Sequence, residues 1–235
     1  MQAPLLSEHE IRQRIWTELQ RAPQDRHSQW RTPVLATVDK KGAPDARTVV
    51  LRHADAKLSR LHIYTDLRSP KVAELADQPN AMLVFWSKRL NWQLRVRVQI
   101  SVQTAGPQVD AVWARVSQSA AAAGDYLLPL APGDRLHDAP TPPRDSTHPH
   151  HLAILVAQVQ EIDWLELARS GHRRALLGAD TWAWRASLML SRRFAPFVKP
   201  ARPEYPPSRS CSPACAFLAS SPKPAARPAA RRWPA

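Results

Sequence analysis

From Trp92 to Val102, apolar side chains alternate with polar ones, as in the run Val96-Arg97-Val98-Gln99. A period of two residues is typical of a β-strand that buries one face and leaves the other in water. Such a strand cannot cover its apolar face alone and needs other elements to pack against it. The fold class therefore depends on how many further strands the chain supplies and how they are connected.

Other runs rich in β-branched and aromatic residues predict more strands. Asp39–Gly42 joins the first two of these expected strands, Val34–Val38 and Ala46–Arg52, as a hairpin turn would. The regular alternation of strands and helices that a parallel sheet requires is missing, so we expect an antiparallel β-barrel with a few helices, an α+β fold that is mainly β. The expected strands are Val34–Val38, Ala46–Arg52, Leu61–Tyr64, Ala81–Trp86 and Ala153–Trp164, with a last pairing inside Gly171–Trp184.

Three helices are expected beside these strands. Residues 7–21 begin with Ser7, followed three residues later by Glu10, which is a capping-box pattern before an amphipathic run. Ser69–Ala76 has Ser at the N-cap position and Pro directly after it. Val109–Tyr126 is a third helical stretch, rich in Ala.

The last part of the chain has a different composition. Residues 188–235 hold ten of the 23 prolines and nine Lys or Arg against one acid, so +8 of the net charge of +13 lies there. We therefore expect one folded domain over residues 1–187 and a tail without fixed structure over residues 188–235. No aromatic residues or reading motif accompany these charges in a pattern that indicates a nucleic-acid partner.

Further signals limit the function classes. The first twenty residues are charged and amphipathic, unlike a signal peptide, and no apolar run reaches the roughly 18 residues of a membrane span. We therefore expect a cytoplasmic protein without a membrane partner. Cys211 and Cys215 are the only cysteines and lie in the tail, so residues 1–187 have no disulfide framework.

A group of histidines, His148, His150 and His151, suggests a metal site at first sight. Pro149 interrupts the group, no acidic residue lies close by, and Gly133–Pro149 has the composition of a long loop. Metal sites need several ligands held at a fixed spacing. We therefore predict no metal site.

Arg47 and Arg52 flank an apolar run of the second expected strand. Five positions apart in one strand, they point to opposite faces unless a bulge intervenes. Both could be ordinary surface charges. Either could also bind a phosphate, whose oxygens match the two-pronged geometry of a guanidinium.

The next segment favours the phosphate hypothesis. Tyr64 and Thr65 end a strand, and Ser69 and Lys71 lie at the start of the following helix. Free backbone N–H groups at a helix N-terminus, with a hydroxyl and an ammonium beside them, form an anion site. The two segments together therefore predict binding of a phosphorylated ligand.

These segments resemble the pyridoxamine 5'-phosphate oxidase family, and most closely its bacterial oxidase-like subgroup. In that family the motifs R-x-V-L-L-K and Y-T-x-x-x-S-x-K bind the phosphate of FMN. The resemblance implies an FMN-binding split β-barrel in which Arg47, Arg52, Ser69 and Lys71 hold the phosphate, with Tyr64 and Thr65 near the flavin. The matching residues are Arg47, Val49, Leu51, Tyr64, Thr65, Ser69 and Lys71, and Arg52 replaces the family's Lys.

The resemblance continues towards the C-terminus. It implies that Gln93 hydrogen-bonds the cofactor, that Trp164 and Arg174 reach the FMN, and that His172 contacts the substrate. Two departures concern the vitamin B6 substrate. Ser170 replaces an Arg that contacts it in the family, and the family's Tyr/Arg/Ser set for the substrate phosphate is not recognisable around residues 113–120.

As a whole, the resemblance implies an FMN-dependent oxidoreductase that acts on a small molecule as a homodimer, with FMN at the subunit interface. The departures predict that oxidation of pyridoxine 5'-phosphate is weak or absent. The alternative is a non-catalytic flavin- or heme-binding module or sensor on the same fold. Turnover with a reduced substrate distinguishes the two hypotheses, whereas retention of a cofactor does not.

Overall fold

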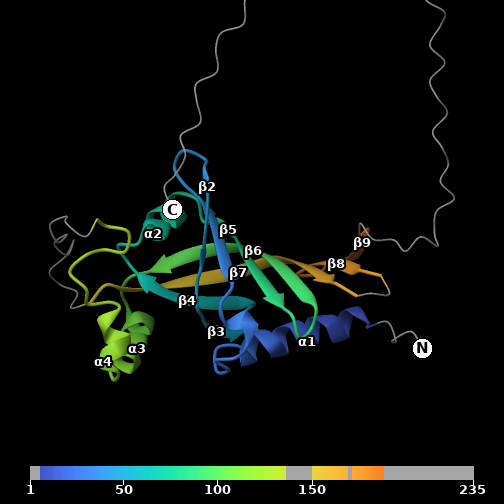
Figure 1. Cartoon of the computed structure of the whole chain (residues 1–235), viewed down its shortest axis with the longest axis horizontal. Coiled ribbons are helices and arrows are strands. Elements are labelled where there is room, and N and C mark those ends of the chain that lie inside the picture. The colour runs from blue at the N-terminus through green and yellow to red at the C-terminus, as the bar shows by residue number, and fades with distance from the viewer. Residues whose placement is uncertain (1–5, 136–149, 169–170, 188–235) are drawn as a thin grey trace, which may run out of the picture. The chain divides into compact units, whose positions relative to one another are not determined.

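The computed structural model describes residues 6–135, 150–168 and 171–187 (Figure 1). Within them, antiparallel pairing gives one nine-stranded sheet in the order β2-β1-β5-β6-β7-β4-β3, and β8 and β9 continue from β7 as a hairpin. The strands are β1 (Val34–Val38), β2 (Pro44–Thr48), β3 (Leu51–Asp55), β4 (Arg60–Asp66), β5 (Asn80–Ser87), β6 (Trp92–Gln103), β7 (Leu152–Glu166), β8 (Arg173–Gly178) and β9 (Trp182–Arg185). The helices are α1 (Glu8–Arg21), the 3-10 turn η1 (Gln29–Arg31), α2 (Pro70–Asp77), α3 (Pro107–Val116) and α4 (Ala120–Gly124).

The sheet curls because its two outermost strands follow each other in the chain. β2 and β3 lie at opposite ends of the strand order, yet only Val49 and Val50 separate them. The ends of the sheet must therefore come close together, as in a barrel. No ladder joins β2 to β3 among the described strands, so the barrel is split at this point. The expected mainly antiparallel split-barrel fold is confirmed.

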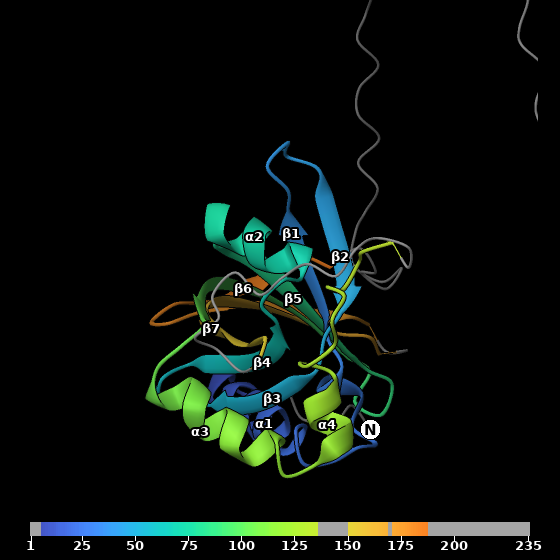
Figure 2. The same ribbon diagram turned by 90° about the vertical axis from the view of Figure 1, so that its left-hand side faces the viewer.

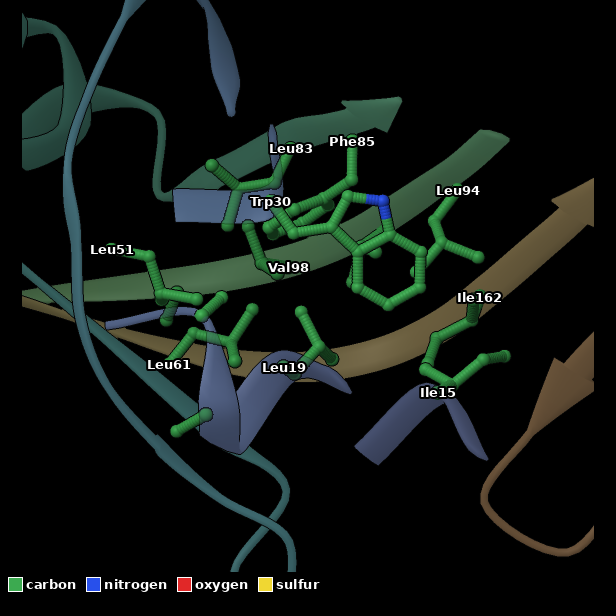
Figure 3. Packing of buried hydrophobic residues seen from close by; sticks show 14 of the residues in the cluster. Ile15, Leu19, Trp30, Leu51, Leu61, Leu83, Phe85, Leu94, Val98 and Ile162 are labelled. Carbon is green, nitrogen blue, oxygen red and sulfur yellow. The ribbon is translucent and has the colours of Figure 1, made fainter. Parts of the chain in front are cut away.

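Helix α1 supplies one side of the core. Its capping box forms between Ser7 and Glu10, and Ile11, Ile15 and Leu19 are buried at one-turn intervals. Figure 3 shows Ile15 and Leu19 directed towards core side chains from β3 to β7. Truncating a buried leucine such as Leu19 to alanine costs about 2–5 kcal/mol of folding free energy.

The helices divide the surface into two regions. Figure 2 shows α2 beside the β1–β2 hairpin, while α3 and α4 lie beside β3 and β4 at the other end of the barrel. The hairpin turn has the expected residues: Asp39 N–H bonds the Ala43 carbonyl at 2.9 Å, and Gly42 takes a φ of +83° that favours glycine. Helix α2 and the α3–α4 pair therefore lie on two different parts of the barrel surface.

Two expected elements are divided in the structure. The strand expected at Ala46–Arg52 is interrupted after Thr48, because the chain passes there from one edge of the sheet to the other. The helix expected at Val109–Tyr126 breaks after Val116, and Ser119 caps a new short helix by accepting a hydrogen bond from Ala122 N–H. Serine competes with helix geometry through such local bonds.

Several sequence predictions fall outside the described residues. They concern the tail over residues 188–235, most of the expected loop at Gly133–Pro149, and Ser170. Among the helices that the structure describes, none is both long enough and apolar enough to cross a membrane.

Candidate functional site

Thr65, Ser69 and Lys71 meet where β4 passes into α2. Ser69 is the N-cap of α2, but its hydroxyl makes no capping bond and instead accepts a hydrogen bond from Lys71 Nζ. The same ammonium donates to Thr65 Oγ1 at 3.1 Å. Both hydroxyl residues are buried, so the two hydroxyls and the ammonium form a compact polar group at a helix N-terminus. We call these three residues together with Arg47 the cradle.

The cradle has the electrostatic character of an anion site. Burial lowers the pKa of Lys71, and the positive charge of Arg47 lowers it further. A bound anion would stabilise the charged form of Lys71. It would thereby offset the effects of burial and of the Arg47 charge on the pKa of this residue. The donor set of an ammonium, a guanidinium and two hydroxyls matches the oxygens of a phosphate group.

Arg47 reaches the cradle from β2. Its guanidinium donates hydrogen bonds to Thr37 Oγ1 and Asp45 Oδ2, and to Glu74 Oε2 at 2.9 Å. Glu74 belongs to α2, one turn after Lys71, so the helix that carries the ammonium also anchors the guanidinium. Arg47, Thr65, Ser69 and Lys71 are thus brought together, as the sequence predicted.

Arg52 takes part in a different site. A β-bulge between Leu51 and His53 leaves Arg52 and His53 both exposed between buried neighbours. The guanidinium of Arg52 lies over the Tyr64 ring, 5.9 Å from its centroid. The structure therefore does not bring Arg52 to Arg47 and Lys71, because the chain changes strand between the two arginines, and the shared phosphate site stays a prediction.

Arg52 and Tyr64 line a cavity of about 440 Å³ between β3, β4 and the α3–α4 pair, which we call the second pocket. Arg115 donates a hydrogen bond to the Tyr64 hydroxyl at 2.7 Å. Burial raises the pKa of Tyr126, which keeps this phenol protonated and able to donate. The polar side chains that line the second pocket include Arg52, Tyr64, Arg115, Ser119 and Tyr126, together with one carboxylate, that of Asp125.

The second pocket changes one sequence interpretation. The Tyr/Arg/Ser set for a second phosphate was not recognisable from residues 113–120. The structure brings Arg115 and Ser119 to one cavity, and Tyr126 joins them from beyond the helix break. The four-residue spacing of Arg115 and Ser119 is the feature of the sequence that indicates part of this set. The position of Tyr126 could not be predicted in the same way, because it depends on the turn between α3 and α4.

Gln93 and Arg174 lie on a third surface, the outer face of β6, β7 and β8. In the register of these strands Leu165 stands between them. Arg174 donates to both oxygens of Asp163, from Nε at 2.8 Å and from NH2 at 2.6 Å, and Arg95 donates to the same carboxylate. Burial acts to raise the pKa of Asp163, but the hydrogen bonds from Arg174 and Arg95 outweigh it and the pKa is lowered.

This face borders a cavity of about 470 Å³ that is lined by several arginines, Arg174 among them. Gln93 and Arg174 are therefore on the same face and accessible, which a shared ligand would require. The structure does not bring them to the cradle within the described chain.

The structure places Trp164 in the core, so its contact with a cofactor stays a prediction that this arrangement does not support. Trp164 is 0% exposed and packs edge-on against Trp92, with ring centroids 5.2 Å apart. Alternation along β7 points it to the core, whereas Asp163 points outward. The ten-residue spacing to Arg174 therefore joins side chains on opposite faces.

Three other predicted residues have limited roles in the structure. The side chains of Val49 and Leu51 are buried in the core, so only their main chain remains for a ligand. His172 is partly exposed, and its Nδ1 is buried without a hydrogen-bond partner in the described part of the chain. Within these residues, no group of three or more His, Cys, Asp or Glu is arranged to hold a metal ion.

Comparison with known proteins agrees with this geometry. Residues 12–104 match the family described as pyridoxamine 5'-phosphate oxidase, FMN-binding domain. A pyridoxine/pyridoxamine 5'-phosphate oxidase of Maricaulis maris is 44% identical over 80 residues, which are 34% of this chain and 35% of that protein. One from Caulobacter vibrioides is 35% identical over 130 residues, 54% of this chain and 57% of that protein. The chain thus matches less than two thirds of the length of either relative.

A solved structure extends the comparison to the whole barrel. It is a pyridoxamine 5'-phosphate oxidase-related, FMN binding protein from Nostoc punctiforme, 25% identical, with a TM-score of 0.58. The alignment covers 77% of this chain and 97% of that one. The similarity therefore includes strands beyond the segment matched by the family.

Proposed function

The chain belongs, through residues 12–104, to the family of the pyridoxamine 5'-phosphate oxidase FMN-binding domain, and on that premise we propose that it is an FMN-dependent oxidoreductase acting on a small anionic substrate. The observation that carries the proposal is the cradle. Lys71 and Arg47 place two cations beside the buried hydroxyls of Thr65 and Ser69 at the N-terminus of α2.

The cradle fits the phosphate of FMN. The Ser69 hydroxyl makes no capping bond and instead accepts a hydrogen bond from the Lys71 ammonium. Pro70 contributes no N–H at the first position of α2, so side-chain donors carry most of the recognition. When bound, FMN supplies two-electron redox chemistry, and the protein's part is to bind, orient and polarise.

The second pocket supports an anionic substrate. Arg52 and Arg115 supply two guanidiniums, and Ser119 and Tyr126 supply hydroxyl donors in the same cavity. Alternation along β4 directs Thr65 to the cradle and Tyr64 to the second pocket. The cofactor phosphate and the substrate anion would thus be bound on opposite sides of one strand.

A homodimer with FMN between the subunits would give Gln93 and Arg174 a ligand. Both lie on the outer face of the sheet, away from the cradle of the same chain, and Arg174 lines a cavity there together with three further arginines. A second copy could present its FMN to this face. Light scattering of the purified protein, with and without FMN, tests the dimer independently of turnover.

The experiment that tests the function is an absorption spectrum of the purified protein, followed by FMN titration and a panel of reductants and substrates. Flavin absorbance, saturable FMN uptake and turnover of NAD(P)H or a phosphorylated substrate support the proposal. Protein that neither carries flavin nor takes it up contradicts it. FMN binding without turnover across the panel favours the alternative of a non-catalytic flavin-binding module.

A further inference from the structure

Behind the cradle, three side chains from three elements form a closed hydrogen-bonded group. Thr37 of β1 donates to Glu74 Oε2 of α2 at 2.5 Å, and Arg47 of β2 donates to the same oxygen at 2.9 Å. Arg47 also donates to the Thr37 hydroxyl. Each member therefore bonds the other two, and a single carboxylate oxygen accepts from both partners.

This group is shielded from water. Thr37 is 3% exposed, and the side chains of Glu74 and Arg47 are 12% and 20% exposed. A buried carboxylate is costly unless it is paired and hydrogen-bonded, so Glu74 needs Arg47 and Thr37 as partners. In the same way, the group fixes the rotamer of Arg47, whose long side chain otherwise has much conformational freedom.

The arrangement leaves part of the guanidinium for a ligand. Of its five N–H donors, one is used by Thr37, one by Asp45 and one by Glu74. Among the contacts within the described residues, two donors remain, one on Nε and one on NH1. Glu74 accepts from the NH2 group of Arg47, and it lies one turn after Lys71, another cradle residue, on the same helix.

We propose that Glu74 is a positioning residue that, through Arg47, gives the cradle its preference for a flavin carrying a phosphate over one without it. The inference rests on the proposed function, since it requires FMN to bind through the cradle. Riboflavin lacks the phosphate but keeps the ring system. A residue that acts only through Arg47 on the phosphate changes the affinity for FMN and leaves that for riboflavin unchanged.

The test measures dissociation constants of FMN and riboflavin for the full chain by fluorescence quenching or calorimetry. We expect Glu74→Ala to weaken FMN about tenfold or more, on the scale of one charge-assisted hydrogen bond, and to change riboflavin by less than about twofold. Glu74→Gln keeps one oxygen able to accept from Thr37 and Arg47, so it should bind FMN at least as well as the wild type.

Asp45→Ala is the matched control, because Asp45 also bonds Arg47 but its side chain is 53% exposed. An exposed ion pair contributes little, so the FMN preference should persist. Thr37→Val is a nearly isosteric second variant that removes the hydroxyl from the group. Like Glu74→Ala, it should lower the preference for FMN over riboflavin. It therefore tests the same inference if Glu74→Ala does not fold.

The outcomes separate the inference from its premise. If Glu74→Ala and Thr37→Val keep the FMN preference or bind FMN more tightly, Glu74 does not position Arg47 and the inference is wrong. Equal weakening of FMN and riboflavin would assign Glu74 a general structural role and would also overturn it. If the wild type shows no preference for FMN over riboflavin, the proposed function fails first, before any variant is compared.

Discussion

Arg47 and Arg52 are five residues apart in the chain but belong to two edge strands and to two different cationic sites. Arg47 is bonded to Glu74 and Thr37 beside the cradle, whereas Arg52 lies over Tyr64 in the second pocket. The break between β2 and β3 and the bulge after Leu51 cause this separation. Two anionic groups can therefore be bound by cations from one short sequence segment.

The separation of the two arginines gives the first prediction. Arg47→Ala should weaken FMN binding by about 1.5–3 kcal/mol, the scale of hydrogen bonds to a charged group. Arg52→Ala should leave the FMN affinity within about threefold of the wild type, because its side chain faces the second pocket. Calorimetric titration of both variants with FMN checks this. Equal losses would mean that both arginines bind the same phosphate.

The second prediction concerns alkaline pH. The pKa of Lys71 is lowered by burial and by Arg47, so in the free protein this ammonium loses its proton at lower pH than an ordinary lysine. A phosphate stabilises the charged form, so FMN binding above that lowered pKa requires proton uptake and becomes weaker as the pH rises. Lys71→Arg should abolish this decline, because arginine stays protonated. FMN affinities between about pH 7 and 10 in both proteins measure the effect. A wild-type affinity that rises with pH would contradict it.

Asp163 gives a third prediction, on acid stability. Its carboxylate binds Arg174 and Arg95, and its pKa is lowered despite burial. A lowered folded pKa means that the carboxylate stabilises the fold above its unfolded pKa of about 3.9 and ceases to do so as the pH falls through the folded value. Asp163→Asn should therefore cost about 1–3 kcal/mol at pH 7 and much less near pH 2. Urea denaturation at both pH values measures the difference.

Glu161→Gln is the control for that experiment. Glu161 pairs with Arg97 on the same face at 3.2 Å, but the two side chains are 32% and 68% exposed. Such a pair contributes at most about 1 kcal/mol. If the two substitutions cost the same, the Asp163 group is no more important to the fold than a surface ion pair.

Trp164 gives a fourth prediction that separates packing from ligand contact. Its indole Nε1 has no hydrogen-bond partner in the described structure, so Trp164→Phe loses packing but no polar contact. The free energy of unfolding should fall by about 1–3 kcal/mol. The FMN affinity should not change, since the side chain is enclosed by the core. A loss of FMN affinity with an unchanged free energy of unfolding would mean that Trp164 contacts the cofactor.

Much of the fold could be predicted from local patterns, because strands such as β6 alternate and helix α1 begins with a capping box. Val34–Val38 matches β1 residue for residue, a hairpin turn follows it as predicted, and Ser7 and Glu10 cap α1. Side-chain direction was harder, because it depends on strand register. Trp164 and Asp163 are neighbours on opposite faces of β7: the aromatic ring packs in the core, and the carboxylate is 8% exposed and bonded by Arg174 and Arg95.

The second pocket could not be assembled from the sequence for a related reason. Arg52 reaches it only because a bulge adds one residue to β3, and Tyr126 only because Ser119 starts a new helix. Neither event leaves a periodic signal. Glu74 was missed as well, since a single acid on a short helix is indistinguishable from a solvent-exposed one until Thr37 and Arg47 are placed against it.

The last prediction concerns the substrate and separates its binding from its turnover. The second pocket presents Arg52, Arg115 and Ser119, so pyridoxine 5'-phosphate should bind to the FMN-loaded protein more tightly than pyridoxine. Arg115→Ala should reduce that preference about tenfold, as expected for one guanidinium–phosphate contact.

Turnover of pyridoxine 5'-phosphate should nevertheless remain well below about 1 s⁻¹, the low end of ordinary enzymes. Ser170 stands where the family has an arginine that contacts this substrate, and correct orientation at the flavin accounts for a large part of such rates. Ser170→Arg should therefore increase the rate without tightening binding by a similar factor. Stopped-flow measurement of flavin bleaching under anaerobic conditions reports the chemical step, with Arg115→Ala as the comparison that weakens binding. Rapid bleaching by the wild type would mean that Ser170 is no obstacle and that the chain is a competent pyridoxine 5'-phosphate oxidase.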